Sequence, residues 1–372
     1  WMIGKQLRVP IIFCLTLLLG ANYQAGAQGS SRADTTDPYK PVYTVLPLVY
    51  YTPETGLSLG AGGVMTYRYR SDKPTSTPTQ IQIGGAYTLK NQILSYLSYR
   101  TFWNDDQFLA YGEVGYYRYI YKYYGIGPST KPEDEEMFSF TLPRLRFNFL
   151  YKVFPKVYVG ARYWYDDFNI YEVDTGGMLD TQPITGKNGG RAAGLGFVLN
   201  IDSRDNQLYP TDGWFVEFVA LPHRSAFGSD FNFNRYSLDV ATYFTFFDDQ
   251  TLALNFYGES NTGDVPFHQM AQLGGPRQLR GLYQGRYRDN NDILFQTEYR
   301  WMFLERWGAV AFYGIGNVAP EISAYQINKS VHTYGGGLRF KLSKERKANI
   351  RGDVGFSPGE GVKFYLTFTE AF

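Results

Sequence analysis

The chain has 372 residues, with 36 Lys and Arg against 35 Asp and Glu, which leaves a formal net charge of +1. A balance this close to neutral gives no support for nucleic-acid binding. The single cysteine, Cys14, cannot form a disulfide within the chain or a thiolate metal cluster. The chain also holds 33 Tyr, 28 Phe and 40 Gly. Such a composition is typical of membrane β-barrels, whose aromatic girdles lie at the lipid–water interfaces.

Residues 1–27 have the pattern of a secretory signal peptide. Lys5 and Arg8 form a basic start, residues 9–20 are apolar, and Ala25, Gly26 and Ala27 form a small-residue cleavage site. The apolar run is too short for a membrane-spanning helix, which needs about 20 residues. We therefore expect a mature chain that lacks Cys14, with a short periplasmic N-terminal segment over residues 28–42.

Alternation of apolar and polar residues dominates residues 43–372. Over residues 293–303, for example, one face carries Ile293, Phe295, Tyr299, Trp301 and Phe303, and the other carries Gln296, Glu298 and Arg300. This period of two predicts strands with one apolar and one polar face. After residue 27 no stretch is long and apolar enough for a transmembrane helix. The pattern predicts an all-β fold, a transmembrane antiparallel β-barrel of about 16 strands. A soluble all-β protein rich in Tyr is the alternative. The export signal favours the membrane barrel over this alternative.

Three segments in the second half of the chain carry a recognisable combination of motifs. Residues 202–218 read DSRDNQLYPTDGWFVEF, residues 279–282 read LRGL, and alternating segments close the chain at Phe372. Together they resemble the bacterial surface antigen superfamily, the BamA/TamA-like outer-membrane proteins. The resemblance implies a long loop that folds back into the barrel lumen and carries Arg280 and Gly281.

The sequence also departs from that family pattern. Assembly proteins of the family carry periplasmic POTRA domains, and residues 28–42 are too short for one, so we expect a barrel-only member. The family's F-x-D-x-G pattern has Gly314 where the aspartate is expected. The acidic partner of Arg280 would then be Glu298 or Asp353, both of which have lumen-facing parity. Glu370 falls on the expected lipid-facing register of the last strand.

The candidate site residues fall into three groups, each with a plainer alternative. The lumen lock would be formed by Arg280, Gly281, Glu298 and Asp353. In one plainer alternative, Arg280 is an arginine of a surface loop. In the other, these charged residues simply fill the barrel together with Arg300, Arg339 and Arg351. Six residues are expected to shape a turn rather than to bind a ligand: Asp202, Arg204, Asp205, Pro210, Thr211 and Gly213. The C-terminal strand signal would consist of Phe364, Leu366, Phe368 and Phe372.

No catalytic, cofactor or metal site is predicted. The histidines at 223, 268 and 332 are scattered and lack metal-ligand spacing, and the acidic run at 289–292 lacks the distal Glu of a calcium loop. The resemblance implies a protein of the bacterial outer membrane that helps to insert or translocate proteins or lipids. Its partners would be outer-membrane lipid, client outer-membrane proteins and a separate periplasmic protein. The alternatives are a passive, porin-like channel or structural barrel and, less favoured, a barrel enzyme.

Overall fold

The computed structural model describes residues 37–247, 249–343 and 348–372. The expected signal peptide, and most of the expected N-terminal segment, lie outside the described residues. The described chain forms one closed antiparallel barrel of 16 strands, so the predicted fold class is confirmed. None of the helices within these ranges is long and apolar enough to cross a membrane.

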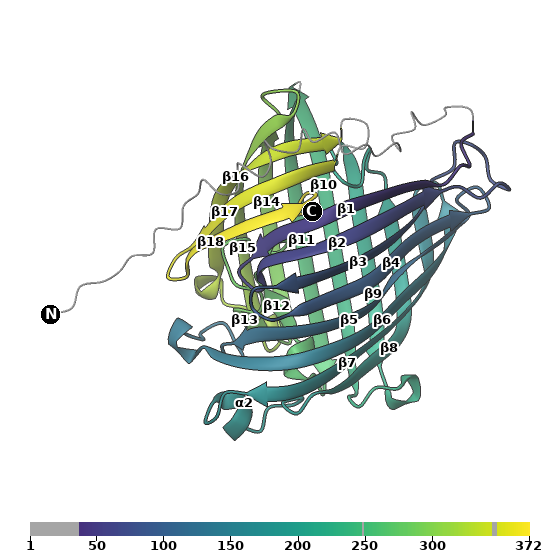
Figure 1. Cartoon of the computed structure of the whole chain (residues 1–372). Helices are drawn as coiled ribbons and strands as arrows, with labels where there is room; N and C mark the ends of the chain where they lie inside the picture. The colour runs from purple at the N-terminus through teal and green to yellow at the C-terminus, as the bar shows by residue number, and fades with distance from the viewer. Residues whose placement is uncertain (1–36, 248, 344–347) are drawn as a thin grey trace.

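Neighbouring barrel strands follow one another in sequence, except at the closure between β1 and β18 and where the connection from β11 to β14 leaves the wall. The barrel strands are β1 (Val42–Thr52), β2 (Gly56–Tyr67), β3 (Thr79–Thr88), β4 (Ile93–Trp103), β5 (Phe108–Tyr123), β6 (Glu136–Phe154), β7 (Val157–Val173), β8 (Gly190–Asp202), β9 (Gly213–His223), β10 (Phe233–Phe247), β11 (Gln250–Gly263), β14 (Asn291–Trp301), β15 (Trp307–Ala319), β16 (Val331–Ser343), β17 (Ala348–Ser357) and β18 (Gly361–Phe368). Between β11 and β14, β12 (Ala271–Leu273) and β13 (Tyr287–Asp289) form a separate two-stranded sheet. Figure 1 shows the tilted strands closing around the lumen.

The remaining elements are short and lie in the connections between strands. They are the helix α2 (Met178–Thr181) and the 3-10 turns Pro132–Asp134, Ser225–Phe227, Phe267–Gln269, Ile322–Ala324 and Ile327–Lys329. Longer connections, including residues 124–135, 174–189, 264–290 and 320–330, share one end of the barrel, here called the long-loop rim. The opposite end, the terminus rim, carries the start of β1, the end of β18 and residues 203–212.

Alternation along each strand separates an apolar outer face from a polar inner face. On β14, Ile293, Phe295 and Trp301 are 39–47% exposed on the outside. Glu298 and Arg300, between them in sequence, are fully buried inside. Charged side chains can occupy the inner face because they pair there, while the outer face meets lipid.

The closing seam between β1 and β18 is the weakest junction of the wall. Its register consists of one pair, Tyr51 with Leu366. By contrast, β1 pairs with β2 along its whole length, from Val42–Thr66 to Thr52–Gly56. In Figure 1 the purple first strand lies beside the yellow last strand at this seam. The backbone groups of β1 facing β18 are therefore largely without strand partners.

The structure of the chain end differs from what the sequence predicted. Strand β18 ends at Phe368, and Thr369 has φ +61, so the last residues leave the strand register. Glu370 turns inward, where it is 8% exposed and accepts a hydrogen bond from Arg339 at 2.8 Å. The prediction that Glu370 faces lipid is therefore wrong. Phe372 likewise packs inward, against Ala241, Tyr243 and Ala253, whereas Phe364 faces outward at 55% exposure.

Candidate lumen loop site

The connection between β11 and β14, residues 264–290, folds back against the inner wall and is here called the lumen loop. Leu273, Leu279 and Leu282 of the loop pack in a buried apolar cluster with Leu294 of β14 and Val318 of β15. Burial of these side chains stabilises the inserted position by roughly 1.5–3 kcal/mol for each large apolar residue. The cluster holds the segment around Arg280 beside β14–β18.

Arg280 lies at the centre of the lumen loop site and is 1% exposed. Its Nη1 donates to Asp353 Oδ2 at 2.6 Å, and its Nη2 donates to Glu298 Oε2. The guanidinium also lies 3.8 Å from the ring centroid of Phe312. Burial alone would lower the pKa of Arg280, but Glu298 and Asp353 outweigh it and the pKa is raised. The structure thus brings together all three charged residues of the predicted lock.

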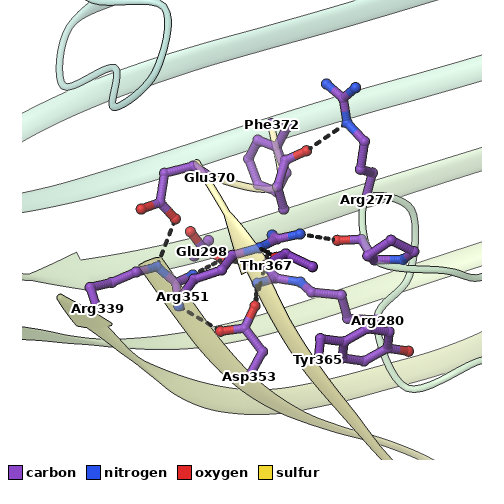
Figure 2. A network of polar contacts seen from close by, with 12 residues as sticks. Arg277, Arg280, Glu298, Arg339, Arg351, Asp353, Tyr365, Thr367, Glu370 and Phe372 are labelled. Carbon is purple, nitrogen blue, oxygen red and sulfur yellow. Dashed lines mark hydrogen bonds and ion pairs between the residues drawn. The ribbon is translucent and has the colours of Figure 1, made fainter. Parts of the chain in front are cut away.

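Three further arginines of the barrel wall bind the same network, and Figure 2 shows two of them, Arg339 and Arg351, beside Asp353. Arg339 bonds to Asp353 at 2.5 Å and to Glu370 at 2.8 Å. Arg300 donates to Glu298 Oε1 at 2.7 Å and to the backbone oxygen of Phe372 at 3.0 Å. Arg351 donates to the backbone oxygen of Pro276 in the loop at 2.7 Å. These contacts join β14, β16, β17, the lumen loop and the chain end.

Gly281 lets the loop backbone lie directly on strand β17. It has φ +118, and a Cβ at this position would meet the Phe356 backbone at 2.7–2.9 Å. On the facing strand, a Cβ on Gly355 would lie 2.7 Å from the nitrogen of Gly281. Both positions therefore need glycine. Sequence reasoning missed Gly355, because a glycine inside an alternating strand carries no signal of what approaches it.

The residue that replaces the expected aspartate, Gly314, also has a physical reason. A Cβ on Gly314 or on Gly316 would lie 2.6 or 2.5 Å from a methyl carbon of Leu279. The loop therefore places an apolar side chain where family members are expected to carry a carboxylate. The acidic partners of Arg280 come instead from β14 and β17.

The predicted turn residues form a compact structure at the terminus rim. Asp205 accepts hydrogen bonds from Thr211 N at 2.8 Å and Thr211 Oγ1 at 2.8 Å, while Arg204 binds Asp202 at 2.9 and 2.8 Å. Gly213 has φ +100 where the chain enters β9. The turn is also linked to the lumen loop site, because the carbonyl of Pro210 accepts a hydrogen bond from Arg300 Nη1 at 3.2 Å.

The lumen loop contacts both sides of the weak seam. Glu54, in the turn between β1 and β2, accepts a hydrogen bond from the backbone nitrogen of Gln284 at 2.8 Å. On β18, the hydroxyl of Tyr365 accepts from Gly281 N at 3.0 Å and donates to Leu282 O at 3.1 Å. Burial raises the pKa of the Glu54 carboxyl, although the Gln284 amide opposes it. Sequence reasoning missed Glu54, since a Pro-Glu-Thr turn gives no sign that its carboxylate points inward.

His268 of the lumen loop predicts a pH dependence of stability. Its ring stacks on Phe168 with centroids 4.0 Å apart, and neither ring nitrogen has a hydrogen-bond partner among the described residues. Burial, assisted by Arg288 and Arg235, lowers its pKa to about 3 from 6.5. The folded protein therefore favours the neutral form of the His268 ring. The resulting contribution to the unfolding free energy is present above pH 6.5 and is lost as the pH falls.

Between pH 7 and pH 5, we expect His268 to cost about 2 kcal/mol of unfolding free energy. The measurement is urea unfolding at both pH values, with His268→Phe as the matched variant that keeps an aromatic ring on Phe168. The variant should lose about 2 kcal/mol less than the parent. An equal loss in both proteins would show that this ring is already protonated, or solvated, in the fold.

The described residues contain no group of three or more His, Cys, Asp or Glu side chains placed to hold a metal ion.

Comparison with known proteins agrees with this architecture. Residues 86–357 match the model of the Omp85 superfamily domain. No protein with a curated description matches the sequence. Among solved structures, BamA from Haemophilus ducreyi lacking POTRA domains 1–3 is similar with a TM-score of 0.59 and 14% identity, over 89% of this chain and 70% of that one.

CdiB from Acinetobacter baumannii has a TM-score of 0.57 at 10% identity, over 89% of this chain and 65% of its own. CdiB from Escherichia coli has a TM-score of 0.57 at 11% identity, over 87% of this chain and 62% of its own. This chain therefore spans less than two thirds of either CdiB chain. At these identities the likeness concerns the fold.

Proposed function

The chain belongs to the Omp85 superfamily of integral outer-membrane barrels, and we propose that it assists the insertion or translocation of proteins or lipids at that membrane. Barrels of this superfamily act with partner proteins and clients rather than as enzymes. The similar structures, which include BamA and CdiB, share the barrel fold. The finer role rests on features of this chain's own wall and lumen.

The single strand pair at the seam is the observation that carries the proposal. With only Tyr51 and Leu366 in register, most of the facing edges of β1 and β18 can pair with another strand. A client strand that adds to such an edge gains main-chain hydrogen bonds before it leaves the wall. Separating one pair also costs far less than separating the full β1–β2 ladder.

The lumen loop supplies a means of holding the seam shut. It binds Glu54 on the β1 side, Tyr365 on β18 and, through Arg280, Asp353 on β17. Release of the loop would remove these contacts together, so the Arg280 site acts as a lock on the seam.

Longer loops of such barrels face the outside, which places the terminus rim toward the periplasm. Clients and a separate periplasmic partner would approach at that rim. Outer-membrane lipid would contact the apolar outer face.

A reversible disulfide across the seam tests the role. Tyr51→Cys with Leu366→Cys joins β1 to β18, because directly opposed strand residues suit disulfide geometry. Val49→Cys with Leu59→Cys joins the fully paired β1 and β2 and is the matched control. The assay is the folding rate of a small unfolded outer-membrane barrel into liposomes that contain each protein, oxidised and reduced.

We expect the parent to accelerate folding over empty liposomes, the seam disulfide to abolish the acceleration, and reduction to restore it. The control disulfide should have no effect. Equal rates with and without the parent protein would contradict the proposed function. Full activity of the oxidised seam variant would show that the seam is not the route.

A passive channel is the second candidate, and one observation favours it. A cavity of about 810 Å³ lies between the inner wall, the lumen loop and the chain end, with Gln80, Gln82 and Asn200 among its polar lining residues. Steady ion conductance without any client effect would support this reading over the first.

A further inference from the structure

A group of arginines lies on the inner face of β4–β7, across the barrel from the lumen loop site. Arg100 of β4, Arg146 of β6 and Arg162 of β7 are joined there by Trp164. The guanidinium carbons of Arg146 and Arg162 lie 4.1 and 4.6 Å from the Trp164 ring centroid. These residues are here called the arginine wall.

Two of these arginines, Arg100 and Arg146, share their nearest carboxylate with another arginine. Asp202 is already held by Arg204 at 2.9 and 2.8 Å, while Arg100 lies 3.8 Å away. Within the part of the chain that the structure describes, Arg100 donates no hydrogen bond.

Arg146 is in a similar position. It binds Asp166 at 2.9 Å, yet Arg144 already holds the same carboxylate at 2.8 Å. Cations kept this close together without carboxylates of their own repel one another. Ion pairing within the barrel therefore does not account for the positions of Arg100 and Arg146.

The unsatisfied polar atoms of the arginine wall are all of one kind. The Nε of Arg100, the Nε of Arg146 and the Nε1 of Trp164 are buried and have no acceptor among the described residues. All three are N–H donors. Buried donors without acceptors are costly, so a group that brings acceptor oxygens would be stabilised here.

The wall also has room for such a group. Arg100 and Arg146 line both the cavity of about 810 Å³ and an adjoining recess of about 360 Å³. Their side chains keep 28% and 27% exposure, so their outer nitrogens reach this space. The recess is lined by two carboxylates. Glu217 is already occupied by Arg162 at 2.8 Å and Tyr111 at 2.6 Å, and Glu113 accepts a hydrogen bond from Tyr117 at 2.7 Å and lies 3.8 Å from Arg144.

We propose that the arginine wall binds a phosphate group within the lumen, with Arg100 and Arg146 as its principal ligands. Guanidinium forks match phosphate oxygens in pairs, and Trp164 holds the Arg146 fork in place. The phosphate belongs either to a free anion or to a lipid headgroup that enters the lumen. Both sources offer the same chemistry to the site.

Isothermal titration calorimetry of the refolded protein in a non-ionic detergent tests this site. One arm titrates inorganic phosphate and the other titrates dihexanoyl phosphatidylglycerol. Saturable binding in the first arm alone indicates a free anion, and binding in the second alone indicates a headgroup. Binding in both indicates recognition of the shared phosphate. Absence of saturable binding in both arms overturns the proposal.

Arg100→Gln and Arg146→Gln should each weaken the observed binding by about tenfold, the loss of one charge-assisted hydrogen bond. Neither change strands a carboxylate, because Arg204 and Arg144 remain in place. Arg191→Gln removes an arginine that is 51% exposed beyond the wall and should change nothing. Unchanged affinity in both wall variants would also overturn the proposal. Arg100→Lys, which keeps the charge without the fork, provides a further variant if a glutamine variant does not fold.

Discussion

Replacing Arg280 with alanine is expected to free the lumen loop and to lower the unfolding free energy by about 3 kcal/mol. The loss arises because Glu298 and Asp353 would remain buried without their central cation. Breaking a buried pair on one side costs about 3–5 kcal/mol. The lower end applies here, because Arg300 and Arg339 still bind these carboxylates at 2.7 and 2.5 Å.

Planar-bilayer conductance of Arg280→Ala provides the functional readout. A released loop should turn a small, flickering conductance into a large or unstable one. Arg277→Ala is the matched control, since Arg277 is an exposed arginine of the same loop with one weak bond, 3.3 Å to the Ala371 oxygen. A large, steady conductance that is identical in parent and Arg280→Ala would exclude the lock and favour the simple channel.

Gly281→Ala is expected to have an effect of similar size for a different reason. The substitution forces a Cβ to within 2.7 Å of the Phe356 backbone and imposes φ +118 on an L-residue. Backbone strain of this kind costs roughly 1–3 kcal/mol, and the clash with rigid backbone adds to it. We expect a loss of about 3 kcal/mol or more, measured by denaturant unfolding, with the loop displaced from β17.

Gly359→Ala separates the effect of backbone strain from the effect of the clash. Gly359 has φ +79, but a Cβ there meets nothing within 4 Å, so only backbone strain remains and about 1–2 kcal/mol should be lost. If Gly281→Ala were no more damaging than Gly359→Ala, the loop would not rest on β17 in the folded protein.

The barrel could be predicted because its signal is local and repeated. Each alternating segment, such as 293–303, states independently which face meets lipid, and the closed topology follows because open edges are costly in hydrocarbon. The approach of Arg280 to Glu298 and Asp353 followed from inner-face parity together with the family resemblance. Both inferences depend on regular strands.

Features outside regular strands could not be predicted in this way. Strand parity assigns Glu370 to lipid only if β18 continues, and the positive φ of Thr369 ends it. Likewise, the burial of Glu54 depends on the Gln284 amide, which is distant in sequence and meets it only after the loop has folded inward. The crowding at Gly355 is a property of the neighbour it packs against, not of its own strand.

Hydrogen–deuterium exchange of the protein in lipid nanodiscs tests the central claim, that the seam is a weak junction held by the lumen loop. Amides of β1 and β18 at the seam should exchange much faster than those in the fully paired β10 and β11, and faster still in Arg280→Ala. Equal protection of the seam and of β10–β11, unchanged by the substitution, would contradict it.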